Sequence, residues 1–200
     1  MNVRLKKSYA FNVGIFLNDE FCIQEMTCSL EFYTNTQDSL AQNIAIDRWR
    51  YFFDHVIDGA VLVDSSKKDR ISALQAQGIR VIDLPDECYD QIVGIAIYLK
   101  LNTIAETALI VTDVSIASNQ GQYVHYLHNE NESTGSLDHD HGWWVENSPN
   151  YCNFRDVGGK IVKLKPLETW RDLDLHFDDD EGQSKSDTVT KILQFTKNES

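Results

Sequence analysis

The chain has 200 residues, of which 42% are hydrophobic and 10% aromatic, enough apolar material to bury the core of one domain. It carries 31 acidic and 18 basic residues, so its formal net charge is −13 and its pI is about 4.7. A surface of this sign repels phosphate backbones, which argues against generic DNA or RNA binding. No apolar run approaches the roughly 20 residues needed to cross a bilayer, so we expect no membrane segment. The four cysteines form no C-x-x-C pair, which favours reduced thiols in a cytoplasmic protein.

The N-terminal third predicts a β-hairpin followed by a helix. Apolar and polar residues alternate loosely over residues 9–17 and 21–33, and Asn18–Glu20 between them has turn chemistry. Polar interruptions make the first segment a strand rather than a signal peptide. Residues 37–57 carry apolar side chains at the three-and-four spacing of a helix with one wide buried face, which Gly59 ends.

A strand, a helix of about ten residues and a second strand follow. Residues 60–64 show no alternation, which is typical of a strand buried on both faces. We expect a helix over residues 67–77 that ends at Gly78, because glycine readily adopts the left-handed conformation common after a helix. Residues 79–82 form the next short strand. This order is that of a βαβ crossover, so we expect the two strands to lie parallel.

The remaining elements begin with the most apolar helix of the chain. Apolar residues surround most of its axis, which predicts that it is central and buried. In order, we expect a helix over residues 85–106, strands over 109–116 and 122–127, an acidic loop over 129–141, an apolar segment at 143–145 and a last strand over 160–164.

Histidine and aspartate gather around the acidic loop in a pattern that resembles a metal site. The candidate ligands are His125, His128, Asp138, His139, Asp140 and His141. Imidazole and carboxylate groups together hold zinc, manganese or iron, so a divalent metal is the cofactor this pattern would take. One observation argues against a metal site: His125 and His128 are three residues apart, and residues at that spacing on a strand point to opposite faces. The alternative is an ordinary solvated loop, under which the chain has no cofactor.

Two aspartates on predicted strands have both a functional and a structural interpretation. Asp64 ends a strand, where ligands of parallel sheets gather, but it also suits capping of the helix that follows. Asp113 is either an outward-facing strand residue or a buried, hydrogen-bonded one. No glycine loop for phosphate and no nucleophile motif with supporting context is present, so we assign no catalytic residue.

Two apolar groups are candidate partner-binding residues. Trp143 and Trp144 follow the acidic loop and are either anchors for a partner or a lid over the end of the core. Near the C-terminus, Ile192, Leu193 and Phe195 reappear after an acidic, serine-containing linker. They either dock on the parent domain or form a short motif for another protein. Their arrangement is similar to the hydrophobic C-terminal peptides with which accessory proteins grip a sliding clamp.

Several segments resemble uncharacterised proteins of large T4-like tailed bacteriophages. They are Glu31–Thr36, Asn43–Phe53, Tyr98–Asn102, Val111–Ile116 and Gly142–Trp144, within a stretch from about Phe11 to Trp144. The resemblance implies a small acidic phage protein made in the host cytoplasm that modulates host or phage machinery. It brings no activity that transfers to particular residues.

These observations predict a single α+β domain over residues 1–177, with a mixed β-sheet, about three helices, the order ββαβαβαββ and a β-rich C-terminal extension. Residues 178–200 form a disordered acidic tail with a short hydrophobic motif. The leading hypothesis is a non-enzymatic accessory protein that binds a host or phage protein through its acidic surface and C-terminal motif. The alternatives are a metal-dependent hydrolase that uses the His/Asp-rich loop, and a small-nucleotide-binding sequestering protein.

Overall fold

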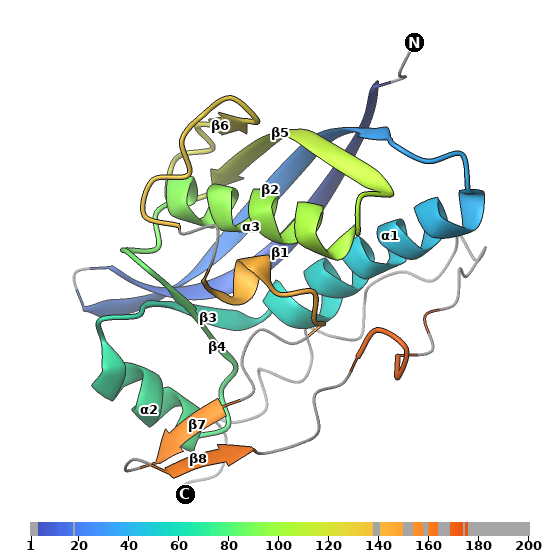
Figure 1. Ribbon diagram of the computed structural model, residues 1–200. Coiled ribbons are helices and arrows are strands. Elements are labelled where there is room, and N and C mark those ends of the chain that lie inside the picture. The colour runs from blue at the N-terminus through green and yellow to red at the C-terminus, as the bar shows by residue number, and fades with distance from the viewer. Residues whose placement is uncertain are drawn as a thin grey trace, which may run out of the picture.

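A computed structural model describes residues 4–17, 19–137, 141–149, 154–157, 160–163, 169–173 and 175. The elements in chain order are β1 (Arg4–Leu17), β2 (Glu20–Thr34), α1 (Ser39–Tyr51), a π-helical turn (Phe52–Ile57), β3 (Ala60–Asp64), α2 (Lys68–Ala76), β4 (Val81–Leu84), α3 (Asp90–Ile104), β5 (Leu109–Ser118), β6 (Tyr126–Asn129), a 3-10 turn (Trp143–Val145), β7 (Phe154–Val157) and β8 (Lys160–Lys163). The chain is an α+β domain, and the predicted order ββαβαβαββ is confirmed from β1 to β6 (Figure 1). The predicted tail of residues 178–200 lies outside the described residues.

A six-stranded mixed sheet organises the domain, with the strand order β4-β3-β1-β2-β5-β6. The long hairpin β1–β2 pairs antiparallel along its whole length, and β2 continues antiparallel to β5. On the other side, β1 pairs parallel with β3 at Val13 and Gly14, and β3 pairs parallel with β4. The carboxyl ends of β1, β3 and β4 therefore meet at one edge of the sheet.

The predicted βαβ crossover is confirmed in β3, α2 and β4. Successive residues of β3 alternate between two packed faces, since Leu62 belongs to the main core while Val61 and Val63 pack with residues of α2. Gly78 has φ +76°, the left-handed conformation expected after this helix. Both faces of β3 are thus buried, as the lack of alternation predicted.

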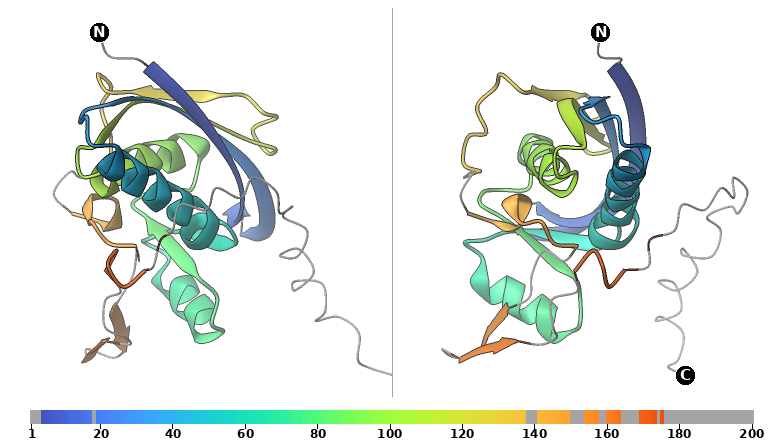
Figure 2. Two further views of the ribbon diagram at one scale, coloured as in Figure 1. Left: turned by 90° about the vertical axis from the view of Figure 1, so that its right-hand side faces the viewer. Right: turned by 45° about the vertical axis from the view of Figure 1, so that its right-hand side comes forward.

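Helices α1 and α3 lie on the sheet face opposite to the one that packs against α2 (Figures 1 and 2). Asp38 caps α1 by accepting from the Leu40 amide, which supports the predicted helix start. The α-helix ends at Tyr51, however, and the predicted continuation to residue 57 is a π-helical turn, closed by the Asp58 amide on the Phe53 carbonyl at 3.3 Å. The wide turn keeps its four apolar side chains buried.

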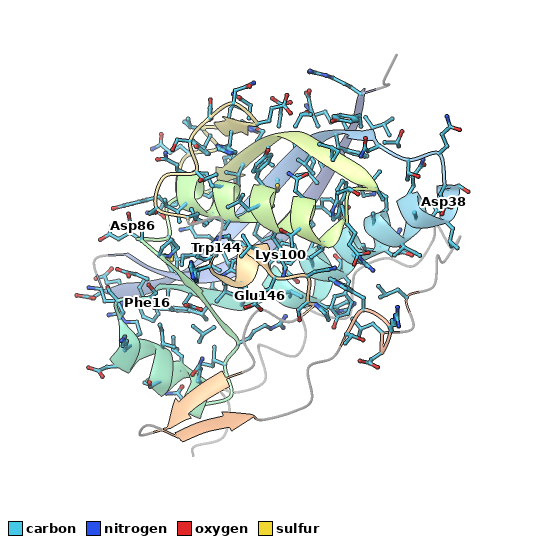
Figure 3. All side chains as sticks on the ribbon, in the orientation of Figure 1. Phe16, Asp38, Asp86, Lys100, Trp144 and Glu146 are labelled. Atoms are coloured by element: carbon cyan, nitrogen blue, oxygen red, sulfur yellow. The ribbon has the colours of Figure 1, made fainter. Side chains whose placement is uncertain are left out.

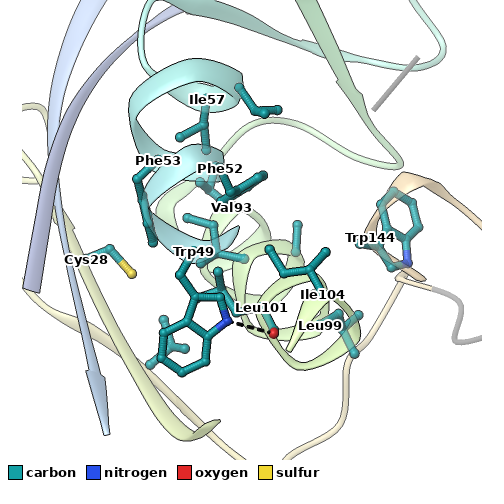
Figure 4. Packing of buried hydrophobic residues seen from close by; sticks show 14 of the residues in the cluster. Cys28, Trp49, Phe52, Phe53, Ile57, Val93, Leu99, Leu101, Ile104 and Trp144 are labelled. Atoms are coloured by element: carbon teal, nitrogen blue, oxygen red, sulfur yellow. Dashed lines mark hydrogen bonds between the residues drawn. The ribbon is translucent and has the colours of Figure 1, made fainter. Parts of the chain in front are cut away.

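The core lies between the sheet and these two helices. Trp49 of α1 is fully buried and donates its indole N–H to the Leu101 carbonyl of α3 at 2.9 Å (Figure 4). Phe32 of β2 meets the Trp49 ring edge-on at 5.0 Å. Nine of the fifteen α3 residues are buried, which confirms it as the central helix.

Two predicted boundaries were wrong for reasons of backbone geometry. Helix α3 begins at Asp90 rather than at residue 85, because Tyr89 before it is extended, with φ −70° and ψ 155°. Strand β6 begins at Tyr126 rather than at residue 122, because Gln122 and Tyr123 have left-handed φ values of 52° and 59° that no strand residue adopts.

A strap formed by residues 142–148 crosses the end of α3. Lys100 of α3 is 1% exposed, and its ammonium donates to the carbonyls of Trp143, Glu146 and Ser148 at 3.0, 2.7 and 2.9 Å (Figure 3). The Trp143 indole N–H donates to the Asp83 carbonyl of β4 at 2.9 Å. The strap is therefore part of the folded core. Among the described residues, no helix has the length and apolarity of a membrane span.

Candidate functional site

Two adjoining cavities lie beside the carboxyl ends of the parallel strands. The inner cavity, of about 230 Å³, is bounded by the ends of β1 and β3, the start of α2 and residues 87–89. The outer cleft, of about 450 Å³, is open and lies between the start of α3 and the segment joining β5 to β6. Cys88 and Tyr89 line both, so the two cavities adjoin at these residues. Ligands of open parallel sheets bind at such strand ends.

The floor of the outer cleft is a polar network. Ser118 is 1% exposed, and its hydroxyl donates to Asp90 Oδ2 at 2.9 Å while it accepts from the Gly121 amide at 3.0 Å. Asp90 stands in the first turn of α3, where the helix dipole favours a carboxylate. The chain thus fixes one carboxylate at the base of the cleft.

A strained segment forms one wall of the outer cleft. Gln24 of β2 is 3% exposed and forms two hydrogen bonds with Gln120. Its side-chain NH₂ donates to the Gln120 side-chain oxygen at 3.0 Å, and its side-chain oxygen accepts from the Gln120 backbone N–H at 3.1 Å. Two consecutive left-handed residues, Gln122 and Tyr123, follow. Such conformations are costly and persist where the surrounding structure holds them. Here the Gln24–Gln120 pair holds the segment against β2.

Apolar and aromatic side chains form the rest of the wall. Tyr89 and Val124 stand at the rim, 59% and 71% exposed. Tyr126 and His125 line the cleft beside them, and His125 Nδ1 is 2.8 Å from the Ser115 hydroxyl. Apolar walls with a few convergent polar groups are characteristic of small-molecule sites.

Cys88 lies between the two cavities. Burial raises the pKa of its thiol to about 12, and the nearby carboxylates of Asp64 and Glu87 add to the rise. The thiol is therefore protonated at neutral pH and is a poor nucleophile. It can contribute shape and a weak donor to the site.

Asp64 combines the two roles that the sequence left open. Its Oδ1 accepts from the Ser66 amide at 2.8 Å, so it caps the turn before α2. It also lines the inner cavity, at the strand end where the sequence placed it. Asp113 of β5 is half-buried and lies opposite Glu31 in the register of the neighbouring strand β2.

The predicted metal cluster is not assembled in the part of the chain that the structure describes. His125 is exposed and faces Ser115, whereas His128 is 1% exposed and contacts the Tyr98 ring at 4.8 Å. His141 is exposed. Asp138, His139 and Asp140 lie outside the described residues. Within that part, no three His, Cys, Asp or Glu side chains are grouped to hold a metal ion.

Of the predicted partner-binding residues, the structure describes Trp143 and Trp144 alone. Trp143 and Trp144 are 5% and 7% exposed, so they are not exposed anchors. Their rings meet edge-on at 5.8 Å, and Trp143 stacks on Phe52 at 6.2 Å. The structure favours the other interpretation, a lid on the core. Ile192, Leu193 and Phe195 lie outside the described residues.

Sequence reasoning missed Asp90, Ser118 and Gln24. They come from α3, β5 and β2, and only the sheet order and the start of α3 bring them together. No local motif marks them. His125 is the one residue lining the cleft that the sequence analysis singled out, although for another role.

No family model matches this sequence, and no curated protein does. Several solved structures are similar to this chain at low identity. An uncharacterized protein of Wolinella succinogenes is 10% identical, with a TM-score of 0.48 over 65% of this chain and 99% of that chain. The 6-pyruvoyl tetrahydropterin synthase of Plasmodium vivax is 12% identical, with a TM-score of 0.44 over 64% and 99%. That of Plasmodium falciparum is 9% identical, with a TM-score of 0.38 over 64% and 98%.

These comparisons correct the functional hypothesis drawn from the sequence. The named neighbours are synthases, and the prediction of a non-enzymatic interaction protein is contradicted on that ground. Similarity at this low identity does not transfer the substrate of those proteins to this chain. The function has to be argued from the cleft.

Proposed function

We propose that the outer cleft binds a small planar molecule that carries amino or ring N–H donors. The observation that supports this most is the Asp90 carboxylate, fixed by the buried Ser118 hydroxyl at the base of an otherwise apolar cleft. An ionised carboxylate only accepts hydrogen bonds. Its partner in the cleft is therefore a donor.

The lining also limits the charge of the ligand. Neither lysine nor arginine is among the residues that line the outer cleft, so a phosphate would meet Asp90 without a cation to balance it. A neutral or cationic donor group suits the site better. Tyr89, Tyr126 and His125 offer ring faces and edges to a flat molecule.

The volume sets the size of the ligand. A water molecule occupies about 30 Å³ in the liquid, so 450 Å³ corresponds to about fifteen such volumes. A fused bicyclic heterocycle of about ten to twelve heavy atoms fits this space at that scale. Larger ligands would extend past Val124 into solvent.

Calorimetric titration of the full chain tests this proposal. We expect 2,6-diaminopurine to bind and unsubstituted purine, which lacks the amino groups, to bind at least tenfold more weakly. Asp90→Asn should weaken binding of the diamino compound by about tenfold to a hundredfold, because a hydrogen bond to a charged group contributes about 1.5–3 kcal/mol. Asp113→Asn, outside the cleft, is the matched control. Absence of binding, or equal affinities for the Asp90 and Asp113 variants, would overturn the proposal.

A further inference from the structure

The inner cavity is lined by charged residues of both signs. Five charged residues line it, and they are Asp19, Asp64, Lys67, Arg70 and Glu87. Asp64 ends β3, and Asp19, Lys67 and Glu87 lie in the segments that follow β1, β3 and β4, where the carboxyl ends of the parallel strands meet. The crossover β3–α2–β4 therefore builds this cavity.

Lys67 and Arg70 are the two cations that line the cavity, and Lys67 is exposed. Arg70 is engaged, since its guanidinium lies 2.7 Å from Asp19 Oδ1 and stacks over the Phe16 ring at 4.1 Å. Lys67 is close enough to Asp19 to lower the pKa of that carboxyl, but the Arg70 hydrogen bond is the larger cause. No described residue forms a hydrogen bond or an ion pair within 4 Å with the Lys67 ammonium.

Asp64 and Glu87 are two of the three carboxylates that line this cavity. Both lie near Cys88, because both raise the pKa of its thiol. Asp64 uses Oδ1 to cap the Ser66 amide, and Glu87 uses Oε2 to accept from the Tyr89 hydroxyl. Each carboxylate keeps one oxygen without a hydrogen bond to the described part of the chain, and neither has a cation partner there.

We propose that the inner cavity binds a small zwitterion of the α-amino acid class, with its ammonium group between Asp64 and Glu87 and its carboxylate at Lys67. An ammonium group is a donor only and suits two carboxylates. A carboxylate suits the unpaired lysine. Ile15, Leu62 and Val63 supply an apolar wall for a short side chain.

The size of the cavity agrees with this class. At about 30 Å³ per water, 230 Å³ corresponds to about eight such volumes, the size of a small amino acid. The site is separate from the Asp90 floor of the outer cleft, so the inference does not depend on the function proposed above.

NMR titration of the ¹⁵N-labelled full chain with three probes tests the proposal. L-alanine carries both charges, propionate only the carboxylate and ethylamine only the ammonium group. We expect alanine to bind at least tenfold more tightly than either, with shifts at residues 64–67 and 87–89. Weak or absent binding of alanine, or a single-charge probe that binds as tightly, would overturn the zwitterion site.

Two variants test which residues hold the carboxylate and the ammonium group of the ligand. Lys67→Gln should reduce alanine affinity at least tenfold, to the level of ethylamine, whereas Lys68→Gln, its neighbour outside the cavity lining, should leave it unchanged. Asp64→Asn keeps an oxygen to cap Ser66 but loses the charge, so it should reduce alanine affinity to the level of propionate while the fold is kept. Equal effects of the two lysine substitutions would refute the assignment. Asp90→Asn should not change alanine binding, which separates this site from the outer cleft.

Discussion

Lys100 shows how one buried charge joins distant segments of this chain. Its ammonium lies in the interior and donates hydrogen bonds to three strap carbonyls, whose dipoles stabilise the buried charge. Burial lowers the pKa of Lys100 to about 8, and Glu146 opposes this shift. Burial of Lys100 therefore costs free energy, but removing its side chain should destabilise the fold by more.

Replacing Lys100 by methionine keeps the length of the side chain and removes the ammonium donor from three carbonyls, of which those of Trp143 and Glu146 each keep a backbone N–H donor. We expect Lys100→Met to lower the free energy of unfolding by about 3 kcal/mol, since losing one partner of a buried polar group costs more than the bond contributes. Urea denaturation measures the loss, and hydrogen exchange should show faster exchange over residues 143–148. Lys68→Met on exposed α2 is the control, with a change within about 0.5 kcal/mol. A similar value for Lys100→Met would contradict this account of the strap.

His128 predicts how stability depends on pH. Burial lowers its pKa below the ordinary value of 6.5, and Glu132, 3.4 Å from Nδ1, only partly offsets this. As the pH falls through 6.5, the unfolded chain binds a proton before the folded chain does, so stability is lost below that pH.

Replacing His128 by phenylalanine should therefore flatten the pH dependence of stability. Between pH 7 and pH 5, the wild-type chain should lose up to about 1.4 kcal/mol per pH unit more than His128→Phe does. Urea denaturation across this range measures the slope. Exposed His55→Gln is the control and should keep the wild-type slope. Parallel curves for wild type and His128→Phe would show that this imidazole is not responsible.

At the scale of elements, α3 approaches the sheet closely because of one glycine. A Cβ added at Gly94 would lie 2.9 Å from Ile116 Cγ2 on β5 and 3.3 Å from the Tyr126 ring on β6. The sequence alone does not distinguish this glycine from a neutral helix residue. Its role follows only from the sheet order, which sets β5 and β6 beneath α3 (Figure 2).

Gly94→Ala tests this close approach. Alanine favours helix by about 1 kcal/mol, but overpacking a tight contact costs about 1–3 kcal/mol. We expect a net loss of about 1 kcal/mol in the free energy of unfolding, together with shifted NMR signals of Tyr126. Asn43→Ala, at an exposed position of α1, should be neutral or stabilising. A stabilised Gly94→Ala protein would mean that α3 lies farther from the sheet than described.

For the whole molecule, local patterns predicted the elements but not their neighbours. The apolar run of residues 60–64 and the glycine at 78 were enough for the parallel crossover, because both signals are local. The β1–β2 hairpin was also predicted, because the two strands are consecutive, but the pairing of β1 with β3 joins segments far apart in sequence, and no periodicity encodes it. Burial of Trp143 likewise depends on a lysine 43 residues earlier.

The candidate site was only partly predictable for the same reason. Asp64 was placed at a strand end correctly, since its position follows from the strand itself. His125 was singled out as a metal ligand but lines the outer cleft instead. Asp90 and Ser118 acquire their importance from each other, 28 residues apart, and from the burial of their hydrogen bond.

Chemical-shift mapping shows whether the outer cleft is a small-molecule site. Titrating the ¹⁵N-labelled full chain with 2,6-diaminopurine should shift the amide signals of residues 88–91 and 118–126 in a saturable manner. The same titration of Asp90→Asn should leave those signals nearly unchanged. Saturable shifts confined to another part of the chain, or none at all, would contradict the account.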